Sequence, residues 1–343
     1  MYGLFNKRAN DALNANPDVF LYPQSSQINI TTRGSDWYWT VTAVMAVSTI
    51  AFMGMSFTVP RRNRIFHYIT AAITLVASIA YFTMASNLGY AAIPVEFIRS
   101  NPKVAGMDGL NYREIFYVRY IDWFVTTPLL LMDLLLTAGL PWPTILYTIL
   151  MDEVMVITGL VGALVASSYK WGYFVFAMFA LFFIAYNVCW VGQKHARAIG
   201  PNVSRTFLQC GVWTIFLWFL YPIAWGLSEG GNIIAPDSEA AFYGVLDIMA
   251  KPVFGALLLW GHRNIDPATL GLHIRDYDDP ITHNEKHGHA GIGSAAAQPH
   301  NHSNGANNGV VDGHNTTTTP ATTSGNTAGV APTSTGTHGT SAV

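Results

Sequence analysis

The chain has 343 residues, of which 51% are hydrophobic and only 11% are charged. Soluble domains carry roughly 25% Asp, Glu, Lys and Arg, so this composition excludes an ordinary soluble enzyme. The net charge of -2 argues against a nucleic-acid-binding protein that relies on a basic surface. Two cysteines, Cys189 and Cys210, are too few for a disulfide framework or a cysteine-rich zinc site. The class that remains is a membrane protein.

Residues 1–35 form a polar leader at the N-terminus. The leader has no apolar core of about 7–15 residues behind a basic start, so the sequence does not predict a cleavable signal peptide. Asn29-Ile30-Thr31 matches the acceptor pattern for N-glycosylation, although such triplets also arise by chance. The leader is therefore expected to be an extracellular segment that precedes the membrane domain.

Seven apolar segments follow the leader, each near the ~20 residues that a helix needs to cross ~30 Å of hydrocarbon. Turn-forming residues such as Pro60 and Gly200 separate them. The second connection, 91–114, is long and polar enough to hold a short hairpin or cap. The pattern predicts an all-α membrane protein whose seven transmembrane helices form a bundle over 36–261. The expected spans are Asp36–Val59, Ile65–Tyr90, Ile115–Thr137, Pro143–Ser167, Trp171–Val191, Thr206–Leu227 and Glu239–Trp260.

Lysine and arginine in the short connections predict the orientation, because these residues accumulate on the cytoplasmic side. The loop after the first span contains three arginines within 60–64, and the loop after the fifth contains Lys194, Arg197 and Arg205. The loop after the sixth span contains neither residue type. Basic residues in the second connection weaken this contrast without reversing it. We expect a multi-pass plasma-membrane protein with its N-terminus outside and its C-terminus in the cytoplasm.

Residues 262–343 are expected to form a cytoplasmic tail. From about Asp278 onward the tail has too little apolar surface to offset the entropy of ordering, so it is expected to be largely disordered. Seven of the eleven histidines lie between His283 and His338. Their spacing is irregular and neither thiols nor clustered acids accompany them, so no metal site is predicted.

Ionisable residues inside the spans are the most informative, because each costs a few kcal/mol near the centre of a bilayer. In the seventh span, Lys251 follows Asp247 by four residues, which places both on one helical face. One interpretation is a structural ion pair. The other is chemical, because a buried lysine can form a Schiff base with an aldehyde. Position alone leaves both open.

The third span adds three aligned charged residues. Asp122 and Asp133 are eleven residues apart, about three helical turns, so they share a face and lie about 16 Å apart. Arg119 lies one turn from Asp122 on the expected extracellular side. A structural role alone is a poor explanation for such a column, whereas proton relays in membranes use such residues.

Aromatic residues line one face of the sixth span, at Trp218, Tyr221 and Trp225. Such rows more often reflect packing than a cofactor site. Pro222 removes a helical hydrogen bond, so a kink is expected there. In the fourth span, Gly159 leaves room for a bulky neighbour.

Taken together, these segments resemble the microbial (type 1) rhodopsins of the fungal branch, similar to the bacteriorhodopsin-like light-driven proton pumps. The resemblance covers all seven spans, and the joint order and spacing of the motifs make it specific. The matching motifs are the run from Arg119 to Asp133 in the third span, Asp152, Met155 and Thr158-Gly159 in the fourth, Trp218, Tyr221-Pro222 and Trp225 in the sixth, and Leu246-Asp247 with Ala250-Lys251 in the seventh.

The resemblance implies that the bundle encloses all-trans retinal, bound covalently to Lys251 as a protonated Schiff base. Asp122 would be the counterion and primary proton acceptor, with Asp247 and Arg119 completing the counterion cluster. Asp133 matches the cytoplasmic proton donor and is expected to begin protonated in its apolar surroundings.

Further roles follow from the same resemblance. Glu229 and Glu239 match the extracellular release pair, although the stretch from Trp225 to Glu229 is one residue shorter than the family pattern. Leu130 occupies the position associated with green absorption. The implied retinal pocket consists of Trp123, Thr126, Thr127, Leu130, Met155, Gly159, Trp218, Tyr221, Pro222 and Trp225.

The expected function is that of a light-driven outward proton pump, an ion transporter and photoreceptor protein rather than an enzyme. Its expected partners are retinal, protons and the lipid bilayer, and nucleic acid is not among them. The sequence leaves open whether the protein forms a homo-oligomer. The main alternative is a sensory rhodopsin with a slow photocycle that signals through a partner. A G-protein-coupled receptor, a chloride pump and a retinal-free, chaperone-like opsin relative are disfavoured, the last chiefly because of Lys251.

Overall fold

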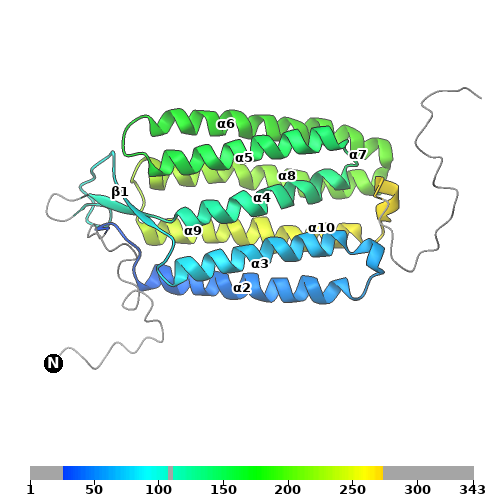
Figure 1. Ribbon diagram of the computed structural model, residues 1–343, viewed down its shortest axis with the longest axis horizontal. Helices are drawn as coiled ribbons and strands as arrows, with labels where there is room; N and C mark the ends of the chain where they lie inside the picture. The colour runs from blue at the N-terminus through cyan, green and yellow to red at the C-terminus, as the bar shows by residue number, and fades with distance from the viewer. Residues whose placement is uncertain (1–25, 107–110, 273–343) are drawn as a thin grey trace, which may run out of the picture. The chain divides into compact units, whose positions relative to one another are not determined.

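The computed structural model describes residues 26–106 and 111–272. Most of the leader and the tail beyond residue 272, with its histidines, lie outside the described residues. Seven long helices run side by side, and a β-hairpin covers one end of the bundle, the hairpin end (Figure 1). The elements are α2 (Thr32–Ser56), η1 (Arg61–Asn63), α3 (Ile65–Ala85), β1 (Ala91–Pro94), β2 (Tyr112–Ile115), α4 (Tyr117–Thr137), α5 (Trp142–Leu164), α6 (Lys170–Tyr186), η2 (Asn187–Gly192), α7 (Gln193–Ile199), α8 (Pro201–Trp225), η3 (Gly226–Gly230), α9 (Pro236–Ile248), η4 (Met249–Val253), α10 (Phe254–His262) and η5 (Pro267–Leu270).

The seven predicted spans are confirmed. The described residues contain seven helices long and apolar enough to cross a membrane, the last three being Lys170–Ile199, Pro201–Gly230 and Pro236–His262. Large apolar side chains point outward from the bundle, among them Ile50 at 72% and Phe179 at 68% exposure. Such surfaces are costly in water but suit contact with lipid hydrocarbon.

Several predicted boundaries are wrong. The fifth span continues through α7, so Lys194 and Arg197 lie on a helix instead of in a loop. A helix can continue into a polar stretch because its backbone hydrogen bonds do not depend on side-chain polarity. The chain instead turns at Gly200, and Pro201 begins α8 at a position where its missing N–H costs nothing.

The ends of the membrane domain also extend beyond the predicted limits. Thr32 begins α2, and Ile28 forms a bridge with Arg113 of β2, so the end of the leader belongs to the fold. At the other end, α10 includes His262, and the short helix η5 packs Leu270 into the core. The membrane domain predicted over 36–261 is therefore too short at both ends.

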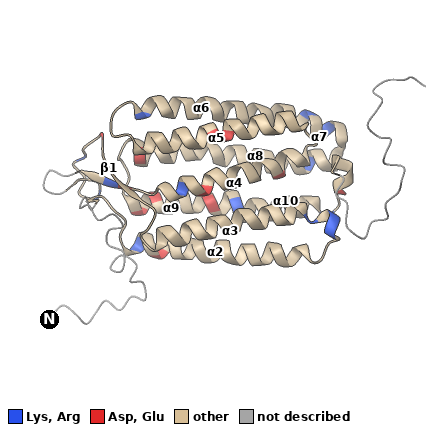
Figure 2. Cartoon of the chain, viewed as in Figure 1, with Lys and Arg blue, Asp and Glu red and all other residues tan. Residues whose placement is uncertain are grey.

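Charged residues gather at the two ends of the bundle and along its interior. Figure 2 shows Lys and Arg at the end opposite the hairpin, and charged residues of both signs beside α4 within the bundle. The basic end includes Arg61 and Arg62 of η1 and Arg197 of α7. The orientation predicted from the loops would place this basic end on the cytoplasmic side.

The predicted hairpin or cap in the second connection is confirmed, because β1 and β2 pair in antiparallel register. Glu114 of β2 is buried, and its Oε2 accepts a hydrogen bond from the backbone N–H of Ile30 at 2.8 Å. Burial, with a smaller contribution from Glu239, raises the pKa of Glu114 to about 8, although the Ile30 N–H and Arg113 oppose the shift. Glu114 is thus expected to be protonated at neutral pH.

Glu114 is expected to make stability depend on pH. A carboxyl group whose pKa is higher in the folded state stabilises the fold fully below its ordinary pKa, near 4.5, and this contribution is lost as pH rises through about 8. The unfolding temperature in detergent should therefore fall as the pH rises from about 5 to about 8 and level off above that. Glu114→Gln should flatten this fall, whereas Glu96→Gln, on the same connection, should leave it unchanged. An equally steep fall in Glu114→Gln would contradict the assignment.

Candidate functional site

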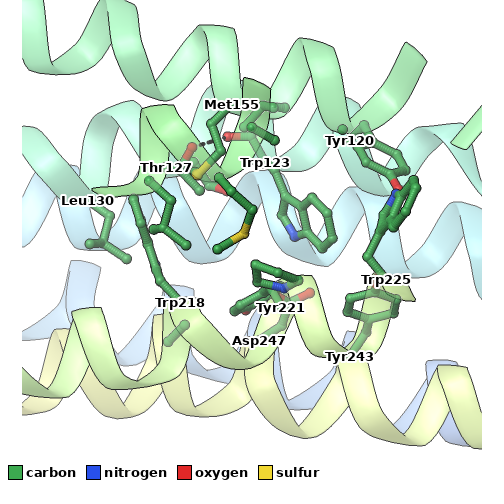
Figure 3. Close-up of a pocket in the computed structure, with 18 of the residues that line it drawn as sticks. Tyr120, Trp123, Thr127, Leu130, Met155, Trp218, Tyr221, Trp225, Tyr243 and Asp247 are labelled. Atoms are coloured by element: carbon green, nitrogen blue, oxygen red, sulfur yellow. Dashed lines mark hydrogen bonds between the residues drawn. The ribbon is translucent and has the colours of Figure 1, made fainter. Parts of the chain in front are cut away.

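An apolar cavity lies inside the bundle, between α4, α5, α6, α8, α9 and η4 (Figure 3). All ten residues predicted for the pocket line it, from Trp123 and Leu130 on α4 to Trp218 and Trp225 on α8. The remaining lining residues are Tyr120, Val156, Phe174, Ala177, Met178, Leu181, Tyr243, Asp247, Ala250 and Lys251.

The fifth span contributes a wall that the sequence reading missed. Phe174, Ala177, Met178 and Leu181 line the cavity from α6. Their spacing of three and four residues is that of one helical face and could have identified them. The signal was hidden because α6 is apolar on every side, so no polar face singles out the inward residues.

Lys251 lies in the π-helical turn η4 at one side of the cavity and is 4% exposed. Pro252, the next residue, has no N–H to continue the regular α-helical bonds, which favours a wider turn here. The indole N–H of Trp213 donates to the carbonyl of Met249 at 2.9 Å, so this backbone group of the turn has a partner. The local sequence thus directs the lysine side chain into the bundle without leaving that carbonyl unpaired.

Two carboxylates hold the amine of Lys251. Its Nζ lies 2.9 Å from Oδ2 of Asp122 and 2.9 Å from Oδ1 of Asp247. Asp247 also accepts hydrogen bonds of 2.6 Å from the hydroxyls of Tyr81 and Tyr221. Oδ1 of Asp122 lacks a hydrogen-bond partner within the described part of the chain. Asp122 therefore has an oxygen free to take up a proton, whereas Asp247 is held by three donors.

The sequence predicts that Arg119 completes the cluster around Lys251, but the hydrogen bonds of its guanidinium go to other residues. Its guanidinium donates to Oε1 of Glu239 at 2.7 Å, to Oε1 of Glu229 at 3.3 Å and to the hydroxyl of Tyr38 at 2.9 Å. It also lies over the ring of Tyr243, 4.1 Å from the centroid. The long side chain reaches toward the hairpin end, where the two glutamates supply the opposite charge that a buried guanidinium needs.

Glu229 and Glu239 are brought together at the hairpin end, each bonded to Arg119. Glu229 lies within η3, so the prediction that it follows the sixth span is wrong, because the helix continues to Gly230. It also accepts hydrogen bonds from the hydroxyls of Tyr120 at 3.3 Å and Tyr243 at 3.2 Å, and from Ser228.

Arg113 is a member of this group that the sequence reading missed. It donates to Oε2 of Glu239 at 2.7 Å, to Oδ1 of Asn232 at 2.8 Å and to the carbonyl of Ile234. Asn232 adopts a left-handed conformation with φ of 49° and donates to the carbonyl of Val104. Arg113 lies on β2, so only the folding of the hairpin onto the bundle brings it to Glu239.

Asp133 lies on α4 eleven residues after Asp122, about 16 Å farther along the axis. Its side chain is fully buried, and neither carboxyl oxygen has a hydrogen-bond partner among residues 26–106 and 111–272. Thr137, one turn farther, donates to the main-chain carbonyl of Asp133 at 2.7 Å. The aligned column of carboxylates predicted for this helix is present.

Asp152 of α5 accepts a hydrogen bond of 2.6 Å from the hydroxyl of Thr127, which lines the cavity. This hydrogen bond joins two neighbouring helices. It fixes α4 against α5 beside the cavity wall.

Comparisons with known proteins match this architecture. Residues 33–265 match the profile of the family described as Bacteriorhodopsin-like protein. The chain is 62% identical to the Opsin-like protein carO of Fusarium fujikuroi, over 93% of this chain and 95% of that protein.

Solved structures agree with this chain in fold. The light-driven proton pump LR (Mac) of Leptosphaeria maculans is 37% identical, with a TM-score of 0.65, and the match covers 70% of this chain and 99% of that one. The light-driven proton pump CsR of Coccomyxa subellipsoidea is 40% identical, with a TM-score of 0.63, over 67% and 97%. The chain therefore belongs to the bacteriorhodopsin-like family of seven-helix membrane proteins, whose chromophore is retinal.

Proposed function

We propose that this protein is a light-driven outward proton pump that carries all-trans retinal as a protonated Schiff base on Lys251. The observation that carries the proposal is the amine of Lys251 at the cavity wall, 2.9 Å from Asp122 and from Asp247, with Asp133 deeper along the same helix as Asp122. The two neighbours described as light-driven proton pumps support it.

The residues around the cavity fit retinal. The lining is mostly apolar and aromatic, as an extended polyene requires, and Lys251 supplies the amine for an aldehyde. A Cβ added to Gly159 would meet only Tyr120, at 3.5 Å, so this glycine keeps part of the cavity wall open. The indole N–H groups of Trp123 and Trp225 have no hydrogen-bond partner within the described residues, consistent with side chains that face an apolar ligand.

Retinal would supply light absorption and an isomerisation that changes the environment of the proton on Nζ. Before light, the carboxylates of Asp122 and Asp247 hold that proton by opposite charge. When the N–H leaves its partners, the proton passes from Nζ to Asp122, whose Oδ1 is free to receive it. Asp247 stays ionised because two tyrosine hydroxyls continue to donate to it.

Asp133 then returns a proton to Nζ from the other side. Its burial without a polar partner favours the neutral acid, which is the form that a proton donor needs at the start. The site thus loses its proton toward the hairpin end and regains it from the opposite end, and transport is directional. The kink that Pro222 predicts in α8 would give this half of the bundle a place to open.

The glutamates at the hairpin end would release the proton. Arg119 contacts both Glu229 and Glu239, so the loss of negative charge when Asp122 takes up the proton can shift the guanidinium between the two glutamates. Arg113 adds a second cation to Glu239. Glu229 has one arginine and three hydroxyl donors, so it is the better candidate to hold the proton that is released.

The orientation belongs to the same proposal. We place the hairpin end and the N-terminus outside the cell and the basic end in the cytoplasm, with the plasma membrane as the destination. Residues 1–35 would be an extracellular leader and 262–343 a cytoplasmic tail, apart from the ordered residues at both boundaries.

External pH under illumination tests the proposal. Cells that express the protein and receive retinal should acidify an unbuffered medium in the light, and a protonophore should cancel the change. Cells that express the protein without retinal are the control. A coloured protein that moves no protons would contradict the pump and favour the sensory alternative.

A further inference from the structure

Arg113 is a buried cation that the hairpin brings to the bundle, and arginine keeps its proton in proteins. The side chain is 1% exposed. Its Nη2 donates to Oε2 of Glu239 at 2.7 Å, and its Nη1 donates to Oδ1 of Asn232 at 2.8 Å and to the carbonyl of Ile234 at 2.9 Å. One guanidinium thus connects Glu239 to the segment of chain that follows η3.

Glu239 has an arginine on each of its two oxygens. Oε1 accepts from Arg119 and Oε2 accepts from Arg113, each at 2.7 Å. Glu229 shares only the first of these arginines, because its Oε1 lies 3.3 Å from Nη1 of Arg119, the same nitrogen that bonds to Glu239. Both glutamates therefore lie against one nitrogen atom, and Glu239 is close enough to compete for a proton that leaves Glu229.

The two arginines are held in different ways. Arg113 is tied to the main chain directly through Ile234 and indirectly through Asn232, which donates to two main-chain carbonyls at 3.0 Å and 3.1 Å. The hydrogen bonds of the Arg119 guanidinium go to side chains. A change of charge at Asp122 can therefore move Arg119 while Arg113 keeps its place.

This difference matters when a proton is released. If Arg119 shifts toward Glu229, Glu239 loses one of its two positive partners. A buried carboxylate without a positive partner is costly and takes up a nearby proton. With Arg113 still bonded to Oε2, Glu239 stays ionised, and the proton from Glu229 is left to go outward.

We propose that Arg113 is the positioning residue that prevents Glu239 from recapturing the released proton; this inference rests on the proposed pump. The proton passes from Glu229 to water at the hairpin end. Glu229 becomes a carboxylate paired with Arg119, and Glu239 remains a carboxylate paired with Arg113. Other titratable groups of the described residues that interact electrostatically with the two glutamates are Tyr38 of α2, Glu114 of β2, Tyr120 of α4, Lys170 of α6 and Tyr243 of α9.

Arg113→Gln tests the charge, because glutamine keeps hydrogen-bonding atoms but has no positive charge. After a flash, the first transfer from Nζ to Asp122, followed by visible absorbance, should be nearly unchanged. Release before uptake, followed by a pH dye, should require an external pH higher by about one to three units, the effect of one opposite charge at short range. An infrared carboxylic acid band of Glu239, assigned with Glu239→Gln, should grow as the band of Glu229 disappears.

Arg99→Gln is the matched control. Arg99 comes from the same connection and holds the same segment, but through a main-chain carbonyl, that of Gly231, at 3.1 Å from Nε and 2.7 Å from Nη2. This variant should leave the pH of release unchanged. Arg113→Lys keeps a positive charge beside Glu239 and should return release to near the wild-type pH. Unchanged release in Arg113→Gln, or an equal shift in Arg99→Gln, would overturn the proposal.

A titration without retinal separates this inference from the pump. In a Lys251→Arg background, which forms no stable imine, the infrared carboxylate band of Glu239 should be lost at a pH about one to three units higher when Arg113→Gln is added. Adding Arg99→Gln should change nothing. A wild-type protein that does not pump, together with this shift, would refute the proposed function and leave Arg113 as the residue that keeps Glu239 ionised. Identical titrations with and without Arg113→Gln would refute the role of Arg113.

Discussion

Lys251→Ala is expected to abolish the visible absorption of protein supplied with retinal. Without Nζ there is no amine at the cavity to form the Schiff base. An unbound retinal could still occupy the cavity but would absorb as the free aldehyde. An absorption spectrum of the purified protein, normalised to its content of aromatic residues, measures the loss. Retained visible absorption would refute Lys251 as the linkage site.

Lys251→Arg is the matched control for this result. Alanine leaves Asp122 and Asp247 without the cation that holds them, and uncompensated buried charge can unfold a protein. Arginine keeps the positive charge but forms no stable imine. A folded, colourless Lys251→Arg protein would show that colour is lost through chemistry. This control also separates the two interpretations of the sequence, since a purely structural ion pair would leave wild-type protein colourless too.

Asp122→Asn is expected to abolish proton transport while the protein keeps its colour. Asparagine preserves the shape of the side chain but cannot take a proton from Nζ, so the first transfer has no acceptor. Lys251 and the cavity remain, so retinal still binds. Light-driven acidification should fall by about a hundredfold or more, as expected for the loss of a group that transfers the proton. Full transport in this variant would contradict the assignment.

Asp122→Glu supplies the comparison. It keeps a carboxylate near Nζ, displaced by about one methylene, so transport should be reduced but measurable. Asp152→Asn is a second control, because this buried carboxyl bonds to Thr127 instead of Lys251. It should change stability more than transport. Equal loss of transport in both Asp→Asn variants would indicate a general structural effect.

The sequence alone predicts which charged residues of one helix lie on the same face. Lys251 and Asp247 are one turn apart, as are Arg119 and Asp122, and helical periodicity alone puts each pair on one face. The ten pocket residues were found because family motifs also have a fixed helical spacing. The same reasoning located seven spans, since a bilayer of constant thickness requires apolar runs of nearly constant length.

Contacts between distant segments were not accessible in this way. Three sets of contacts join elements that are far apart in the chain. They are Arg119 with Glu229 and Glu239, Arg113 of β2 with Glu239, and Thr137 with His262. Side-chain reach and the packing of helices decide them, and neither has a local pattern. In the sequence, His262 is only the first residue of the expected tail.

By itself the sequence determined the class of protein, the number of spans and the candidate lysine and carboxylates, because hydropathy and helical period are local properties. The tertiary structure decided which charges meet. It separated Arg119 from the Lys251 cluster, joined two arginines to the glutamates at the hairpin end and brought His262 to the turn beyond Asp133. The physical reason is that a buried charge or polar atom must find a partner in three dimensions, and several helices compete to supply it.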